Sequence, residues 1–283
     1  MRRVPPGTRS RRTLMGREVI TSTSNPLVKR LKKLRYRKYR ELDGFFLIEG
    51  IAHVRRAVEH EAPVEMLLVA PDLLTSEGAW SVIEAERAAG RNVVEFGREA
   101  FESIVERDHP SGLAATVKGE RPPITGLVAK EGSVFVGLHD VGNPGNLGSI
   151  IRTVDAIGGD GVVIVGDSTD PQHPAAVKAS MGTLFTIPVV YAPTLDDLIG
   201  WCLMDDVRLV TTSVRAEHLI WDVRFELPAL FLFGSEALGL PRDVLDRGDV
   251  SVRLPMEGAA SSLNLAVAAG VVLYEVERQR RIT

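Results

Sequence analysis

Residues 143–153 read NPGNLGSIIRT and follow closely after the apolar run VFVGLH at 134–139. An apolar run of this length is typical of a buried strand, and asparagine followed by proline is typical of a helix start. The next apolar residues, at 147, 150 and 151, have the spacing of one buried helix face. The stretch therefore predicts a strand, a turn that carries two amides, and a helix, which together form the repeating unit of an α/β fold.

The same alternation of strands and helices extends on both sides of this unit. Toward the C-terminus, strands are expected near GVVIV, LFTIPVV, RLVTT, ALFLFG and VSVRLP, and toward the N-terminus near FFLIEG, VEMLLVA, NVVEF and LAATV. Between the two series, KGERPPITGLVAKEG at 118–132 has the composition of a linker. We therefore expect one α/β domain at 19–117, a linker at 118–132 and a second α/β domain at 133–283.

Composition limits the possible classes of protein. No apolar run approaches the roughly 18 residues that cross a bilayer, and no apolar segment of a signal peptide follows the N-terminal arginines. We therefore expect a cytoplasmic protein that makes no contact with a membrane. Cys202 is the only cysteine, and its apolar neighbours predict a buried core thiol rather than a nucleophile. The histidines lack the spacing of metal ligands, so we expect no metal site.

Charge is divided unevenly along the chain. Residues 1–60 hold 16 Lys and Arg against 5 Asp and Glu, whereas the remaining 223 residues hold 18 against 32. Residues 1–18 contain six arginines and little to bury, which predicts a basic flexible arm. A basic N-terminal part joined to an acidic body indicates that the first part meets a polyanion.

Residues 24–44, SNPLVKRLKKLRYRKYRELDG, carry much of this positive charge. Asparagine and proline at 25 and 26 predict a helix start, and leucines at 27, 31, 34 and 42 form a helical stripe with tyrosines 36 and 39 among the basic residues. A run of one sign repels itself unless phosphates lie nearby, which favours nucleic-acid binding over a merely solvated face. The candidate binding residues are Lys29, Arg30, Lys32, Lys33, Arg35, Arg37 and Lys38.

Three loops are expected at the carboxyl ends of the C-terminal strands, the edge at which open α/β sheets bind ligands. They read HDVGNPGNLGSIIR, FGSEALGLP and PMEGAASSLN. Common nucleotide and hydrolase signatures are missing, because the sequence contains no GxxxxGK[ST], GxGxxG, HExxH or GxSxG. Each loop taken alone is compatible with a plain turn.

Together, and in this order, the loops resemble the motifs of the SpoU/TrmH branch of the SPOUT superfamily, which are S-adenosylmethionine-dependent RNA ribose 2′-O-methyltransferases. NPGNLGSIIRT is similar to the first motif, LFLFGSEALGLP to the second and VRLPMEGAASSLNLAVAAGVVLYE to the third, and HPAAVKASMGTLF at 173–185 resembles the segment between the first two. The resemblance implies a C-terminal SPOUT α/β domain with a deep trefoil knot. It also implies a preceding smaller α/β RNA-binding domain of ribosomal-protein type, and a homodimer formed through the knotted domain.

The resemblance also assigns roles to residues. Asn146 and Arg152 match the catalytic asparagine and arginine of the first motif, and Glu236 matches the glutamate of the second. Ser262 and Asn264 match the serine and asparagine of the third motif. The resemblance further implies that S-adenosyl-L-methionine is held at Gly234, Leu254, Met256 and Leu263.

These residue types suit methyl transfer to a hydroxyl. Amides such as Asn146 both donate and accept hydrogen bonds, which serves to align a hydroxyl group. Arg152 can form a bidentate pair with a phosphate beside the target ribose. Because a guanidinium is not deprotonated in proteins, we assign Arg152 to orientation and charge stabilisation and leave water, the phosphate and Glu236 as proton acceptors.

The sequence thus predicts a methyltransferase that acts on ribosomal RNA, with large-subunit 23S rRNA and a role in antibiotic resistance as the narrower expectations. The alternatives are a transfer-RNA 2′-O-methyltransferase and a non-catalytic RNA-binding protein of ribosome assembly. A nucleotide-dependent oxidoreductase is disfavoured because the GxGxxG fingerprint is missing. A base methyltransferase with a cysteine adduct is disfavoured by the apolar setting of Cys202.

Overall fold

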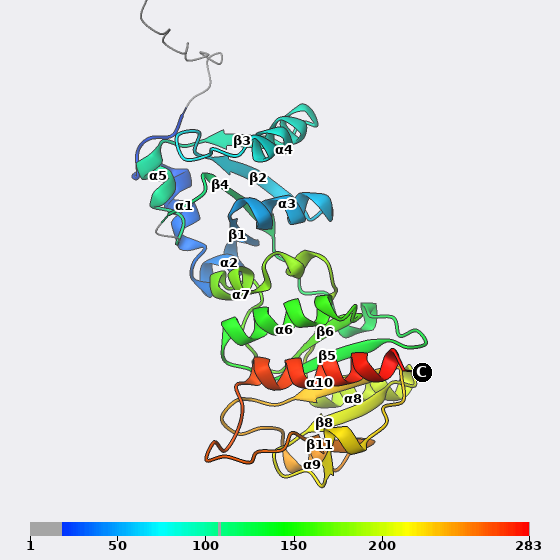
Figure 1. The fold of residues 1–283 in the computed structure, drawn as a ribbon. Coiled ribbons are helices and arrows are strands. Elements are labelled where there is room, and N and C mark those ends of the chain that lie inside the picture. The colour runs from blue at the N-terminus through cyan, green and yellow to red at the C-terminus, as the bar shows by residue number, and fades with distance from the viewer. Residues whose placement is uncertain (1–18, 107–108, 283) are drawn as a thin grey trace, which may run out of the picture.

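Two α/β units make up the molecule, and Figure 1 shows them stacked end to end. The computed structural model describes residues 19–106 and 109–282, so the basic arm expected at 1–18 lies outside the described residues. The predicted fold class, a C-terminal α/β domain preceded by a smaller α/β domain, is confirmed by the two sheets. The knot implied by the resemblance stays a prediction.

The N-terminal unit is built on a four-stranded sheet. Its strands are β1 (Phe45–Glu49), β2 (Val64–Val69), β3 (Asn92–Glu95) and β4 (Leu113–Lys118), and its helices are α1 (Pro26–Lys33), α2 (Arg37–Asp43), α3 (Ile51–Glu59), α4 (Glu77–Ala88) and α5 (Arg98–Glu102). The strand order is β1-β4-β2-β3, with β4 antiparallel to both of its neighbours and β3 parallel to β2. Both faces of this sheet bury apolar side chains, against α3 and α4 on one side and α1 and α5 on the other.

The basic segment at 24–44 forms two short helices rather than the single helix that the sequence predicts. The chain turns between α1 and α2, and the Arg40 side chain donates hydrogen bonds to the carbonyl oxygens of Leu34 and Arg35, both at 2.9 Å. Carbonyl groups at a helix end need such partners, so Arg40 stabilises the break. Leu31 and Leu34 are buried as expected, but Leu42 is exposed, and its predicted place in the apolar stripe is wrong.

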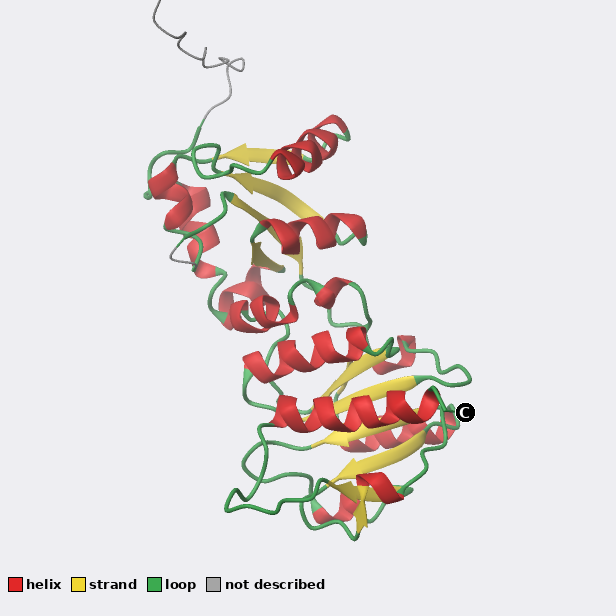
Figure 2. Ribbon diagram, viewed as in Figure 1, coloured by secondary structure: helices red, strands yellow, loops and turns green. Residues whose placement is uncertain are grey.

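The C-terminal unit is built on a seven-stranded parallel sheet in the order β7-β6-β5-β10-β8-β11-β9. These strands are β5 (Val134–His139), β6 (Gly161–Val165), β7 (Val189–Ala192), β8 (Arg208–Thr212), β9 (His218–Leu219), β10 (Ala229–Phe233) and β11 (Val250–Arg253). The helices are α6 (Pro144–Ala156), α7 (Pro174–Ser180), α8 (Leu195–Met204), α9 (Arg242–Leu245) and α10 (Leu265–Arg280). Figure 2 shows α6 and α10 side by side on one face, and the opposite face is covered by α8 and α9. Within residues 19–106 and 109–282, no helix is long and apolar enough to cross a membrane.

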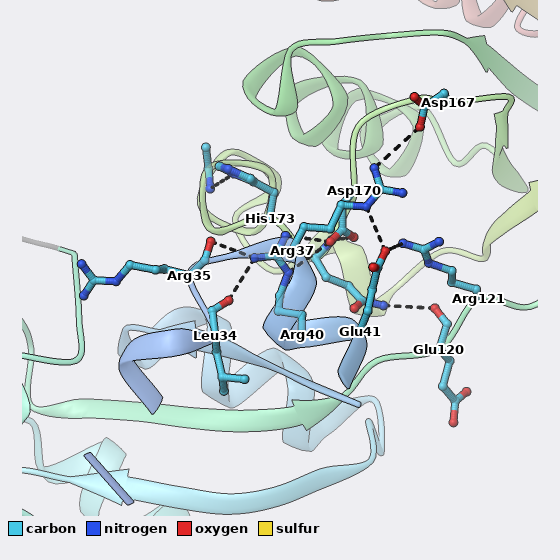
Figure 3. Close-up of polar contacts among 12 residues, drawn as sticks. Leu34, Arg35, Arg37, Arg40, Glu41, Glu120, Arg121, Asp167, Asp170 and His173 are labelled. Atoms are coloured by element: carbon cyan, nitrogen blue, oxygen red, sulfur yellow. Dashed lines mark hydrogen bonds and ion pairs between the residues drawn. The ribbon is translucent and has the colours of Figure 1, made fainter. Parts of the chain in front are cut away.

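A buried ion pair joins the two units (Figure 3). The Arg40 guanidinium of α2 donates to Asp170, in the loop between β6 and α7, through Nη2 at 2.8 Å and Nε at 3.1 Å. The side chains of Arg40 and Asp170 are 1% and 4% exposed. With its bonds to Leu34 and Arg35, Arg40 uses four of its five N–H groups. The same side chain therefore ends α1 and holds α2 to the C-terminal unit.

Further contacts join the C-terminal unit to the N-terminal unit and to the linker. The Phe46 and Phe185 rings stack at 6.4 Å between centroids, and the Gln172 side chain donates to the carbonyl oxygen of Glu120 at 3.2 Å. Gly182 lies against the Arg56 side chain, where an added Cβ would come within 2.9 Å of it. The interface thus combines apolar burial with a satisfied charge pair, which favours one fixed arrangement of the two units.

We predict that Arg40→Ala lowers the free energy of unfolding by about 3–5 kcal/mol, because it leaves the Asp170 carboxylate buried without its partner. Urea unfolding followed by circular dichroism measures this loss. Arg37→Ala is the matched control, since Arg37 is 46% exposed and its ion pair with Glu41 contributes about 0–1 kcal/mol. Equal losses for the two variants would contradict the role given to Arg40.

Candidate active site

A cleft of about 1650 Å³ opens at the carboxyl edge of the seven-stranded sheet. Its walls are the start of α6, the loops after β8 and β10, and the segment between β11 and α10. The three loops singled out from the sequence therefore meet at one place; Figure 1 shows the segment that leads into α10 at the left of the lower unit. Sites for drug-sized ligands measure about 300–1,000 Å³. The cleft is thus large enough for a nucleotide-sized ligand and part of a second molecule.

A chain of hydrogen bonds links the three loops inside the cleft. The Asn264 side chain accepts from the backbone N–H groups of Ala266 and Val267, at 2.9 and 3.2 Å, and so caps α10. Asn264 Nδ2 donates to Asn146 Oδ1 at 3.0 Å, and Asn146 Nδ2 donates to Glu236 Oε1 at 2.9 Å. In each of these bonds the donor lies on the α10 side and the acceptor on the Glu236 side. The positive end of the α10 dipole is therefore linked to the carboxylate through two amides.

Local structure holds Asn146 in this position. The Asn143 side chain accepts from the backbone N–H groups of Gly145 and Asn146, at 2.8 and 3.2 Å, and so caps α6. Pro144 occupies the first turn, where its missing N–H has no cost. The first turn of α6 is thereby fixed, and Asn146, which is largely buried, meets the other two loops.

The Glu236 carboxylate is stabilised in its charged form. Partial burial raises the pKa of Glu236, but the hydrogen bond from Asn146 and backbone N–H groups at 236, 142 and 143 lower it, and the net pKa is below the ordinary value. Glu236 Oε2 also accepts from the Gly142 N–H at 3.3 Å. Glu236 is therefore an anion at neutral pH, in contact with the amide of Asn146.

Gly234 is required by the loop that carries Glu236. A Cβ atom at 234 would lie 2.1 Å from the carbonyl carbon of Gly239, because the loop turns back on itself. The Gly239 N–H donates to the Ser235 carbonyl oxygen at 2.9 Å, which closes the turn. Gly239 itself has φ +70°, a conformation that favours glycine.

Most residues assigned from the resemblance line the cleft, but one does not. Asn146, Glu236, Ser262 and Asn264 and the four predicted cofactor-binding residues Gly234, Leu254, Met256 and Leu263 all lie on its walls. Arg152 is exposed on the second half of α6 and is not part of the lining. Arg152 lies six positions after Asn146, which is a rotation of about 240° around a helix, so the two side chains leave α6 on different faces.

The loop after β8 also lines the cleft, although it is not among the three loops predicted from the sequence. Thr212, Ser213, Val214, Arg215 and Ala216 form one wall of the cleft. The rule that selected the other loops, a position after the carboxyl end of a parallel strand, also applies to this loop. Basic side chains in the cleft were missed as well, namely Arg215, Arg242 and Arg253, and within the described part of the chain none of them forms an ion pair.

The predicted basic residues divide into two groups. Arg30 forms hydrogen bonds with Asp43 at 2.6 and 2.8 Å and with Glu65 at 3.0 Å, and Arg37 donates to Glu41 at 2.9 Å. These two arginines are partly neutralised inside the protein. The others, Lys29, Lys32, Lys33, Arg35 and Lys38, make no ion pair with any described residue. The positive charge offered to a ligand therefore comes mainly from this second group.

Among the described residues, neither Cys202 nor a cluster of metal-ligating side chains lies at the cleft. Cys202 is buried in α8 away from the cleft, and burial, with the nearby Asp249 and Asp205 carboxylates, raises the pKa of its thiol to about 12. The predicted core thiol is confirmed, and it cannot act as the nucleophile of a cysteine adduct. Among the described residues, no cluster of His, Cys, Asp or Glu has the geometry of a metal site.

Comparison with known proteins agrees with this geometry. Residues 133–274 match the SpoU rRNA Methylase family, and residues 25–115 match the MRM3-like substrate binding domain. A 23S rRNA (uridine(2479)-2′-O)-methyltransferase of Streptomyces viridochromogenes is 31% identical over 250 residues, which cover 86% of each chain. The 23S rRNA (guanosine(2553)-2′-O)-methyltransferase RlmP of Bacillus subtilis is 28% identical over 257 residues, 91% of this chain and 98% of the other.

Solved structures share the arrangement of both units. An AdoMet-bound rRNA methyltransferase from Sinorhizobium meliloti superposes with a TM-score of 0.85 at 32% identity, over 92% of this chain and 97% of the other. The SpoU methyltransferase AviRb from Streptomyces viridochromogenes, in complex with AdoMet, gives a TM-score of 0.83 at 30% identity, over 91% and 98% of the two chains. With the family match on the cleft-bearing domain and relatives alike over nearly their whole length, the chain belongs to the SpoU rRNA methylase family.

Proposed function

We propose that this protein transfers a methyl group from S-adenosylmethionine to a ribose 2′-hydroxyl of 23S ribosomal RNA. The observation that carries the proposal is the hydrogen-bond chain from Asn264 through Asn146 to Glu236, which brings all three family motifs into one cleft. Relatives of similar length are named as 23S rRNA 2′-O-methyltransferases, one acting on a uridine and one on a guanosine. Ribosomal RNA is therefore the substrate we favour over transfer RNA, and we place the protein in the cytoplasm with that RNA.

The cleft fits S-adenosylmethionine, which supplies an activated methyl group when bound. Leu254, Met256 and Leu263 offer apolar and backbone contacts, and Gly234 lies in the closed turn beside them. Arginines suit a carboxylate or a phosphate, and Arg215 lies on the same walls. We assign these residues to cofactor and nucleotide binding, together with Ser262, whose exposed hydroxyl lines the cleft.

Asn146 is assigned to alignment of the ribose hydroxyl. One of its two N–H groups is used by Glu236, and one of its two oxygen lone pairs is used by Asn264. The second N–H group and the second lone pair remain for a substrate hydroxyl. Hydrogen bonds on both sides already fix the rotamer of the Asn146 amide, so binding of the hydroxyl costs no further side-chain entropy. Positioning of this kind lowers the entropic barrier of a reaction.

Glu236 is assigned to holding Asn146 in place. A general base works best with a pKa near the working pH. Hydrogen bonds lower the pKa of Glu236 below its ordinary value, which makes the carboxylate a weak base at neutral pH. Because a phosphodiester and a water molecule are weaker bases than a carboxylate, all three stay open as acceptors of the hydroxyl proton.

Arg152 is assigned to the active site of a partner subunit. It is exposed and does not line the cleft of its own chain. The neighbouring helix α10 exposes the apolar side chains of Val267 and Tyr274, which share one helical face. A homodimer that covers this face would bury those side chains, and a two-fold interface would repeat each contact in both directions.

We predict that the wild-type protein transfers labelled methyl to 23S rRNA in a form resistant to alkaline cleavage, and that Asn146→Ala lowers the rate about 10²-fold or more by removing hydroxyl alignment. Label counting after alkaline hydrolysis measures both. The control is Ser149→Ala, a half-buried position on the same helix that does not line the cleft. Transfer only to a base, or to transfer RNA alone, would contradict the proposed reaction or substrate.

We predict that mixing two inactive variants, Arg152→Ala and Asn146→Ala, restores methyl transfer after subunit exchange. In a mixed dimer, the chain with an intact Asn146 receives Arg152 from its partner, so one complete site forms. Activity is measured before the subunits are exchanged in mild denaturant, and again after the denaturant has been removed. No recovery, despite mixed dimers demonstrated by mass, would place Arg152 in the site of its own chain.

We predict that Gly234→Ala abolishes S-adenosylmethionine binding in calorimetry, because the new Cβ collides with the backbone of Gly239 and opens the turn. Gly258→Ala in the neighbouring segment is the matched control, since an added Cβ there meets nothing within 4 Å. Its cofactor affinity should equal that of the wild type. Normal binding by Gly234→Ala would show that the closed turn is not needed for the cofactor.

A further inference from the structure

An aromatic corner lies at the junction of α1 and α2, in the middle of the basic segment. The rings of Tyr36 and Tyr39 meet edge to face, with 6.4 Å between centroids and 64° between planes. Tyr36 is 60% exposed and Tyr39 is 36% exposed, although large aromatic side chains are usually well buried. The two adjacent rings leave an apolar surface open to solvent, and most of it belongs to Tyr36.

Positive charge surrounds this corner. The Lys33 ammonium lies 5.2 Å from the centre of the Tyr39 ring, and Arg35 precedes Tyr36 directly in the chain. Both side chains are exposed, and neither forms an ion pair with a described residue. Exposed rings among unpaired cations are the combination that binds single-stranded nucleic acid, in which bases stack on rings and phosphates contact cations.

We propose that the Tyr36–Tyr39 corner binds one unstacked base of the substrate RNA, with the adjacent phosphates on Lys33 and Arg35. The inference rests on the proposed RNA substrate and adds to it the type of RNA element that the N-terminal unit contacts. An A-form duplex keeps its bases stacked inside, so the ligand is a loop, bulge or single strand. Tyr36, the more exposed ring, provides the stacking surface.

A small cleft beside the corner gives the bound base a polar neighbour. It measures about 250 Å³ and is lined by Arg30, Lys33, Leu34, Tyr39, Leu42 and Asp43. The Arg30 and Asp43 side chains form a paired fork within it, at 2.6 and 2.8 Å. This fork presents both N–H donors and carboxylate lone pairs, which are the groups that contact base edges. Leu42, exposed against the prediction of a buried stripe, forms part of the apolar wall.

The corner is fixed relative to the catalytic cleft. Tyr36 directly precedes α2, and Arg40 of that helix is bound to Asp170 of the C-terminal unit. Arg37, the residue after Tyr36, also contacts the C-terminal unit, with 3.8 Å between its Nη1 atom and Asp167 Oδ1. Stacking at the corner therefore positions RNA with respect to the active site as well as adding affinity.

The test uses a single-stranded RNA of roughly 12 nucleotides that carries one 2-aminopurine, and the duplex of the same sequence. We expect Tyr36→Ala to weaken binding of the single strand roughly 5- to 150-fold, the range for loss of one stacked base. The slope of log affinity against log salt should not change, because no charge is lost. Tyr36→Phe keeps the ring and should bind as the wild type does, with the same quenching of 2-aminopurine.

Two further variants separate stacking from charge and from general damage. Lys33→Gln should reduce the salt slope by about 0.7, the value for one phosphate contact on a single strand. Trp221→Ala removes a ring of comparable exposure from the other unit and should change neither affinity nor slope. Duplex binding should be equal for the wild type and Tyr36→Ala.

Three results would overturn the inference. They are wild-type affinity of Tyr36→Ala for the single strand, equal losses for Tyr36→Phe and Tyr36→Ala, and a loss seen only with assembled ribosomal subunits, which would indicate a protein partner instead. Methyl transfer to 23S rRNA by the same preparations distinguishes this failure from failure of the proposed function. If Tyr36→Ala binds RNA normally and rRNA is still methylated, only the stacking site is wrong.

Discussion

The charge pair between Arg40 and Asp170 is the interaction on which the rest of the structure depends. It ends α1, orients α2 and holds the basic helices against the loop that leads into α7. Both side chains are almost fully buried, so removal of either leaves a buried charge without its counter-charge. From α7 the packing continues directly to α6, where Gly148 allows the two helices to approach: a Cβ there would lie 2.2 Å from the Ala176 carbonyl oxygen. The helix that carries Asn146 is thereby connected to the helices that carry the basic residues.

Inside the cleft, polar contacts rather than apolar packing determine the arrangement. Asn264, Asn146 and Glu236 come from segments about 90 and 118 residues apart, yet each uses its side chain to fix the next. Because each amide bonds to the next residue in the hydrogen-bond chain, the loops meet without leaving the Asn146 oxygen or nitrogen buried and unpaired. The same bonds keep the carboxylate charged. A site organised in this way is set before RNA or cofactor arrives, which is the condition for catalysis by positioning.

Much of this architecture could be predicted from the sequence, and particular residues show where prediction ended. Apolar runs and helix caps gave the strands and most of the helices, and the order of three loops gave the family. The break between α1 and α2 could not be predicted. It depends on hydrogen bonds from the Arg40 side chain to the carbonyl oxygens of Leu34 and Arg35, which in a continuous helix would accept from backbone N–H groups instead. Composition also could not show that Arg30 and Arg37 are neutralised by acidic residues. Two other features could have been predicted: the exit of Arg152 on a different helix face from Asn146 follows from their spacing, and the cleft wall after β8 follows from its position after a parallel strand.

The fixed interface has a consequence for how a substrate is chosen. If the N-terminal unit contacts one nucleotide and the cleft another, the span between them is constant, since α2 cannot swing while Arg40 stays bound to Asp170. Selection then acts on distance in the folded RNA rather than on the order of its bases. Two unrelated sequences that hold an extruded base and a ribose at this span would be equivalent substrates. A matching sequence that folds differently would not be one.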